Sequence, residues 1–146
     1  MATLTRRARW HSERGAELIE MVVVLPLLLL VLFGIIDFGF MFQRYVVLTN
    51  SAMEGARVGI LPGYQLSDAE NRARTYAATG GVPGTVTAVA LLGTINEPGG
   101  GTWPSVQVDV SHFYNYEYIG PIVSLFGGSF TSVNLRARAI MRRQVP

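Results

Sequence analysis

The sequence predicts an α+β protein in which a long N-terminal helix, transmembrane over part of its length, precedes a small antiparallel sheet domain. Three observations predict this class. An apolar run extends from Met21 to Phe42, helical spacing of apolar residues continues to about residue 60, and the C-terminal half alternates apolar and polar residues. The 146 residues correspond to one ordinary domain.

Positive charge is concentrated in a leader formed by residues 1–15. The leader contains Arg6, Arg7, Arg9 and Arg14 against Glu13, whereas the rest of the chain has a slight excess of acidic residues. The formal net charge of +2 therefore reflects the leader and not a basic patch for nucleic acid, and we expect no nucleic-acid partner. Arginines beside an apolar run are typical of its cytoplasmic side.

The run Met21–Phe42 is long enough to cross a membrane. A helix over this range reaches about 33 Å, against about 30 Å for the hydrocarbon core of a bilayer. Its aliphatic residues and phenylalanines favour insertion by about 5–10 kcal/mol, which exceeds the cost of Asp37 at about 3 kcal/mol. We expect one membrane-spanning segment at about residues 21–42, contact with a lipid bilayer, a cytoplasmic N-terminus and an exported domain.

Helical spacing continues beyond the span. Tyr45, Leu48, Ala52 and Ala56 recur at three- and four-residue intervals, and the segment Gly59–Gly63 with its proline ends the helix. The prediction is therefore an N-terminal helix over residues 16–60, followed by a small exported α+β domain over residues 61–146.

A second helix is predicted at about residues 67–79. It opens with Ser67-Asp68-Ala69-Glu70, the pattern of a capping box, and ends at the glycines of residues 80–84. Its expected buried stripe consists of Ala69, Ala73, Tyr76 and Ala77.

Strand patterns occupy the remainder. We expect strands at residues 86–92, 106–111 and about 130–142, with a loop at residues 96–101. The last strand should turn Val133, Leu135, Ala137, Ala139 and Met141 to one face. A cluster of aromatic residues has two interpretations, as core or as a subunit or adhesion surface. Its members are Phe113, Tyr114, Tyr116 and Tyr118.

Residues suited to catalysis are scarce. The chain has no cysteine and no lysine, and its two histidines, His11 and His112, are too few for a metal site. Ser129 lacks the G-x-S-x-G pattern of a nucleophile elbow. We expect no enzymatic activity, no metal and no cofactor.

Two simple interpretations of the N-terminal region compete with a more specific one. A cleavable secretory signal has a shorter apolar core followed by small residues, whereas Gln43-Arg44-Tyr45 follows this run. An ordinary single-span anchor fits the hydropathy but leaves Glu17 and Glu20 unexplained.

The stretch Arg14-Gly15-Ala16-Glu17-Leu18-Ile19-Glu20-Met21 resembles the processing site of type IV pilin-like proteins. Within them it is similar to the TadE-like pseudopilins of tight-adherence (Flp/Tad) systems. In that family, prepilin peptidase cuts after the glycine, and a glutamate stands fifth in the mature chain. A cut between Gly15 and Ala16 places Glu20 fifth. Met21 stands where Flp-type sites usually have an aromatic residue.

The resemblance extends over nearly the whole chain. The span Val22–Phe42 has the proline, the G-I-I-[DE]-F-G pattern and the aromatic end of TadE-like spans, and Asn50–Arg57 resembles their N-x-A-x-E-G-A-R segment. The Leu-Phe-Gly-Gly of residues 125–128 and the final Ala-x-Met-Arg also fit.

The resemblance implies a role for Glu20, which would pair with the α-amino group of a neighbouring subunit and set the stagger between helices. Asp37 is a candidate in-bundle polar contact for a separate reason, because acids within a membrane span tend to face protein. The implied partners are prepilin peptidase, other pilin or pseudopilin subunits and an inner-membrane assembly platform. The implied location is the bacterial inner membrane or an extracellular pilus.

The sequence thus predicts a minor pilin or pseudopilin, cut by prepilin peptidase and assembled through its N-terminal helix at the tip or base of a Tad-type adhesion pilus. The alternatives are an unprocessed single-span exported protein and a pseudopilin of another secretion or uptake system.

Overall fold

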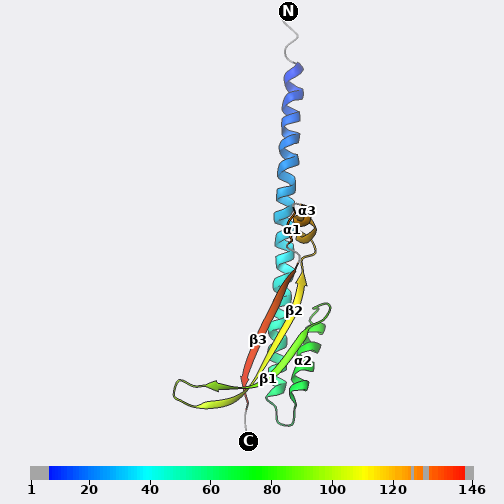
Figure 1. The fold of residues 1–146 in the computed structure, drawn as a ribbon. Coiled ribbons are helices and arrows are strands. Elements are labelled where there is room, and N and C mark those ends of the chain that lie inside the picture. Colours follow the sequence, from blue (N-terminus) through cyan, green and yellow to red (C-terminus); the bar gives the residue numbers. More distant parts are fainter. Residues whose placement is uncertain (1–6, 126, 130–131, 144–146) are drawn as a thin grey trace, which may run out of the picture.

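The protein has three helices and three strands in the part of the chain that the computed structural model describes, residues 7–125, 127–129 and 132–143, with side chains described from Gly15 onward except that of Leu125. In chain order the elements are α1 (Arg7–Gly59), α2 (Leu66–Thr79), β1 (Thr87–Asn96), β2 (Thr102–Asn115), α3 (Ile119–Leu125) and β3 (Ser132–Arg142). Figure 1 shows α1 as a rod whose N-terminal half projects beyond every other element. The predicted α+β class, with a long apolar helix before a small antiparallel sheet, is confirmed.

The two halves of α1 have different surroundings. From Ala16 to Leu29 every side chain is exposed, and the first buried position is Gly34. In the second half, Leu48, Ala52 and Ala56 are fully buried, as their spacing predicts. Tyr45 has the same helical spacing but lies outside this stripe, because its ring turns to the exposed side and lies against Phe42 with centroids 6.4 Å apart.

The sheet covers the C-terminal half of α1 (Figure 1). Its strands are antiparallel in the order β1-β2-β3, and Val108 lies opposite Ala90 on one side and Ala139 on the other. Valines of β2 and alanines of β1 and β3 form the buried face, so the predicted alternation is confirmed. Both β1 and β2 are longer than predicted, because the hairpin continues past the segment that alternates. The predicted strand start at residue 130 lies outside the described residues.

The helix α2 packs beside α1 through alanines. Ala69, Ala73 and Ala77 are fully buried, whereas Tyr76 is half-buried at the edge of the contact. The predicted capping box at Ser67 is wrong, because the helix begins one residue earlier, after Gln65.

Asp68, three residues beyond Gln65, accepts a hydrogen bond from the Gln65 N–H at 2.9 Å. Glu70 instead accepts from the Ala90 N–H at 3.1 Å and pairs with Arg74 at 3.0 Å. The acid expected to complete the cap therefore connects α2 to β1.

Gly55 permits the close approach of α1 and α2. A Cβ at this position would lie 2.8 Å from the Ala69 carbonyl oxygen and 3.0 Å from the Ala73 Cβ. These distances are too short for real contacts, and the first partner is backbone, which cannot move aside as a flexible side chain can. Gly55 is therefore a steric requirement of the helix pair.

We expect Gly55→Ala to destabilise the domain by about 1–3 kcal/mol, the usual cost of overpacking. Thermal unfolding of the full chain in detergent, followed by near-ultraviolet circular dichroism, should show a Tm lower by several degrees. Gly39→Ala is the matched control, because a Cβ at Gly39 meets nothing within 4 Å. Equal Tm values for the two variants would contradict the close approach.

Candidate functional site: the exposed helix and its junction with the domain

The N-terminal half of α1 is an apolar surface without a covering element in the described chain. The segment Gly15–Gly59 is long and apolar enough to cross a membrane, and only 6% of its most apolar 18-residue window is buried. Leu18, Val22 and Leu25 are 66%, 70% and 47% exposed. A core helix of a soluble domain would have such residues covered, so this half of the helix is suited to lipid or to other helices.

Glu17 and Glu20 lie on one face of this helix. Together with Met21, Val24 and Leu28 they line a shallow depression along it. Both glutamates are exposed, and neither has a hydrogen bond or ion pair with any side chain from residue 15 onward that the structure describes. The Glu20 carboxylate, next to an apolar face, is therefore available to a cation from outside the chain.

The predicted cleavage position lies within α1. The helix runs without interruption through Gly15 and Ala16, and Ala16 is exposed. A Cβ at Gly15 would meet nothing within 4 Å. No packing constraint within the described chain therefore requires glycine at this position.

Asp37 has surroundings opposite to those of Glu20. It is fully buried, and its carboxylate accepts three backbone hydrogen bonds from the first residue of α3 and the two residues before it. The Glu117 N–H lies 3.3 Å from Oδ1, and the N–H groups of Tyr118 and Ile119 lie 3.0 and 2.7 Å from Oδ2. The first N–H groups of a helix have no partner inside that helix. The Asp37 side chain on α1 supplies the missing acceptor for the first N–H group of α3.

Aromatic side chains surround this junction. The Tyr114 hydroxyl donates to the Asp37 carbonyl oxygen at 3.0 Å, and the Tyr116 hydroxyl lies 3.5 Å from Met41 Sδ. The Arg44 guanidinium lies over the Tyr114 ring, 4.7 Å from its centroid. Burial, followed by the nearby charge of Asp37, raises the pKa of both tyrosines. Both hydroxyls therefore stay protonated at neutral pH and remain hydrogen-bond donors.

The four residues of the aromatic cluster differ in exposure, so neither interpretation, core or surface, applies to all of them. Tyr114 and Tyr116 are buried at 1% and 6% exposure and belong to the core. Phe113 and Tyr118 are 67% and 42% exposed and are available to a partner. The role of Asp37 as an in-bundle contact between subunits stays a prediction, although both its carboxylate oxygens already accept hydrogen bonds within the chain.

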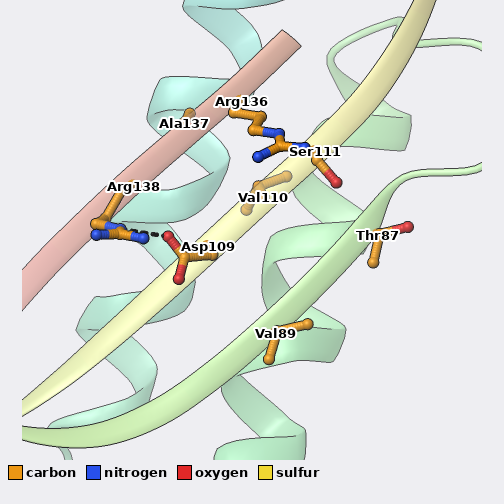
Figure 2. A pocket seen from close by; sticks show the side chains of 8 residues that line it. All are labelled: Thr87, Val89, Asp109, Val110, Ser111, Arg136, Ala137 and Arg138. Atoms are coloured by element: carbon orange, nitrogen blue, oxygen red, sulfur yellow. Dashed lines mark hydrogen bonds and ion pairs between the residues drawn. The ribbon is translucent and has the colours of Figure 1, made fainter. Parts of the chain in front are cut away.

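The sheet face turned away from α1 contains a hollow of about 440 Å³ (Figure 2). Its Asp109 carboxylate accepts from Arg138 Nε at 2.5 Å and from the Gln107 amide at 2.7 Å. Partial burial alone would raise the pKa of Asp109, but these hydrogen bonds and the charge of Arg138 together lower it. The charges of Asp109 and Arg138 thus neutralise each other, and Arg136 is a further cation at the edge of the hollow.

His112 is buried on the opposite face of the sheet, with Nδ1 3.3 Å from the Thr85 carbonyl oxygen. Among the residues that the structure describes, no group of three or more acidic or histidine side chains could hold a metal ion.

The N-terminal part of the chain is similar to a known family. Residues 15–57 match the family model of the TadE-like proteins. This segment of the chain is TadE-like. No curated protein and no solved structure matches the chain. The match begins at Gly15, includes Glu20 and Asp37, and ends at Arg57, so it covers the exposed helix and its junction with the domain but not the sheet.

The start of α3 had no signal that sequence periodicity could detect. The helix has seven residues, and its N-terminal hydrogen bonds come from Asp37, some eighty residues earlier. A buried acid in an apolar helix does, however, indicate a polar partner nearby.

We expect Asp37→Ala to release α3 from α1, because three N–H groups would lose their acceptor, and the buried Ile119 N–H among them costs about 1–3 kcal/mol when it is left unsatisfied. Hydrogen exchange of the full chain in detergent should be at least about tenfold faster across residues 117–125, since 1.4 kcal/mol corresponds to that factor. Gly39→Ala, on the same helix, should leave exchange unchanged. Unchanged exchange in Asp37→Ala would show that these hydrogen bonds do not hold α3.

Proposed function

We propose that this chain is a minor pilin or pseudopilin of a Tad-type machine. Prepilin peptidase removes residues 1–15, and the exposed half of α1 then joins the helices of other pilin subunits at the tip or base of an adhesion pilus. The chain acts as a structural subunit, without catalysis or a cofactor. The observation that carries this proposal is the TadE-like match, which begins at Gly15 and places Glu20 on an uncovered apolar helix.

The position of Glu20 supports a role in assembly. Cleavage after Gly15 creates an α-amino group at Ala16, and a cation in a bundle of apolar helices is costly unless a carboxylate pairs with it. The Glu20 carboxylate is exposed and has no partner within the described side chains of its own chain. Pairing with the amine of a neighbouring subunit would offset the cost of both charges and fix the axial offset of the two helices.

Before assembly, α1 holds the chain in the bacterial inner membrane. The arginines of residues 1–15 favour a cytoplasmic N-terminus, which directs the sheet domain to the exported side. The inner-membrane assembly platform would then take up the processed subunit from this position.

One observation favours a second candidate, an unprocessed single-span anchor. The helix continues without a break across Gly15 and Ala16, as an anchor that is never cut would require. The anchor accounts for the membrane span but assigns no task to Glu20. The next two experiments separate the candidates.

Processing is tested through Gly15. Co-expression with prepilin peptidase should shorten the chain by its first fifteen residues, as measured by intact mass, and Gly15→Arg should block this shortening. A Cβ at residue 15 would meet nothing within 4 Å, so the arginine should interfere with the peptidase and not with folding. A peptidase without its catalytic aspartates is the control. A chain that stays full length beside the active peptidase would favour the anchor.

Assembly is tested through Glu20. Removing one partner of a buried ion pair costs about 3–5 kcal/mol, so Glu20→Ala should lower co-purification with partner pilins by at least about a hundredfold. Glu20→Gln should fail similarly, because the amide keeps the shape but not the charge. Both variants should still insert into the membrane and be largely cut.

Glu17→Ala is the matched control for Glu20, because both residues are exposed on the same face of α1. It should have a mild effect on co-purification. Normal assembly of Glu20→Ala, or an equal defect in Glu17→Ala, would show that Glu20 is only an interfacial residue.

A further inference from the structure

The short helix α3 lies beside a part of α1 that belongs to the membrane-spanning run. The Tyr118 ring, just before α3, stacks on Phe33 with centroids 5.8 Å apart, and Ile119 Cδ1 lies 3.3 Å from the position of a Cβ on Gly34. Both partners on α1 fall within the apolar run Met21–Phe42. Figure 1 shows α3 next to α1 on the N-terminal side of the sheet. Part of the exported domain therefore lies beside the predicted membrane span.

The free faces of α1 at this level, and beyond it toward the domain, are apolar. Ile35, Phe38 and Phe42 are 67%, 49% and 66% exposed. A group of exposed aromatic and aliphatic side chains of this size is unfavourable in water and typical of the end of a membrane span. The water boundary should therefore lie beyond Phe42, which is about 12 Å from Gly34 along the helix.

The first ion pair on the domain side of this boundary is Arg44–Glu117, with nitrogen and oxygen 3.9 Å apart. The segment that follows Glu117 differs in charge from the rest of the domain. From Tyr118 to Leu135 the sequence contains no charged residue. Within α3, Pro121 and Ser124 are exposed and Ile122 and Val123 are half-buried, so its free face presents only apolar or weakly polar groups.

The backbone of α3 has hydrogen-bond partners at both ends. Asp37 accepts from the N–H groups at its start, and the N–H groups of Gly127 and Gly128 donate to the carbonyl oxygens of Ser124 and Val123 at 3.1 and 3.0 Å. A backbone polar group without a partner costs several kcal/mol in hydrocarbon, and at a membrane surface such pairing is a condition for entry. The buried acid in the span meets this condition for α3.

We propose that Tyr118 and α3 form a membrane-seated foot of the exported domain, immersed in the lipid leaflet on the domain's side. The occupant of its free face is lipid, because the face is continuous with the span and lies on the membrane side of Arg44–Glu117. Tyrosine is a favoured residue at this depth, where its ring contacts acyl chains and its hydroxyl reaches the headgroups. The proposal requires insertion of α1 but neither cleavage nor assembly.

The absence of cysteine from the chain makes single-site labelling direct. The full chain is reconstituted in phosphatidylcholine vesicles with an environment-sensitive fluorophore at Ser124→Cys or, independently, at Pro121→Cys. Ser67→Cys is the matched control, since Ser67 is an exposed serine at the start of α2, near the C-terminal end of α1. Val24→Cys, exposed within the span, is the positive control. Quenching is measured with lipids that carry a nitroxide near the top of the acyl chain and with aqueous iodide.

Labels at Ser124 and Pro121 should be quenched several-fold more by the nitroxide lipid, and several-fold less by iodide, than the label at Ser67, as expected for groups about 5–10 Å below the headgroup boundary. Iodide quenching equal to that at Ser67 would place α3 in water and overturn the proposal. Protection from both quenchers would show that protein covers α3, which also overturns it. A label at Val24 that the nitroxide lipid does not quench would show that α1 is not inserted, which would contradict both the membrane span and the foot. The two proposals can fail separately. If the nitroxide lipid quenches the label at Ser124 strongly and Glu20→Ala still assembles normally, the membrane-seated foot is supported and the pilin proposal is contradicted.

Discussion

The hydrogen bonds of the Asp37 carboxylate determine how the two parts of this molecule are joined. Burying a carboxyl group is costly unless it has hydrogen-bond partners, and here three backbone N–H groups compensate for the lost water. They connect α1 to a segment some eighty residues later, directly after the longest strand of the sheet. Tyr114 adds a hydrogen bond to the Asp37 carbonyl oxygen. The position of β2 along α1, and with it the register of the sheet on the helix, follows from this junction.

Away from the junction, the domain is held by small residues in close contact. Alanines of α1, α2, β1 and β3 and valines of β2 supply most of the core, so the layers approach closely and each contact depends on the absence of bulk. The TadE-like match ends in this region, at Asn50–Arg57. Within it, Gly55 admits α2, and Glu54 pairs with Arg57 at 2.7 Å and with Arg72 of α2 at 3.5 Å. The matched segment therefore includes both the exposed helix and the surface on which the domain is built.

Local patterns predicted the elements that depend on local physics. The apolar run and the spacing of Leu48, Ala52 and Ala56 are properties of one helix, and the alternation of β2 is a property of one strand. The features that were missed depend on distant residues: α3 begins where Asp37 accepts its N–H groups, and Glu70 bonds to β1 and not to its own helix end. Asp37 was singled out as a polar contact, but its partner could not be inferred from the sequence. Gly15, Ala16 and Glu20 were predicted through the family resemblance, because residues without packing partners in the domain follow no periodic pattern that the sequence could reveal.

The domain contacts α1 over a long stretch, which has a mechanical consequence. The contacts extend from the junction at Asp37, through the buried Leu48 and Ala52, to the glycine contacts that end at Gly59, about 33 Å farther along the helix. A load pulling the domain along the axis acts on all of these contacts at once, in shear, so the hydrogen bonds at Asp37 resist it together rather than one after another. The domain cannot rotate about a single hinge while contacts over this length stay intact. The helix and its domain should therefore move as one rigid body. A force applied to the sheet would then be transmitted to the membrane-side end of α1 with little of it absorbed by bending between helix and domain.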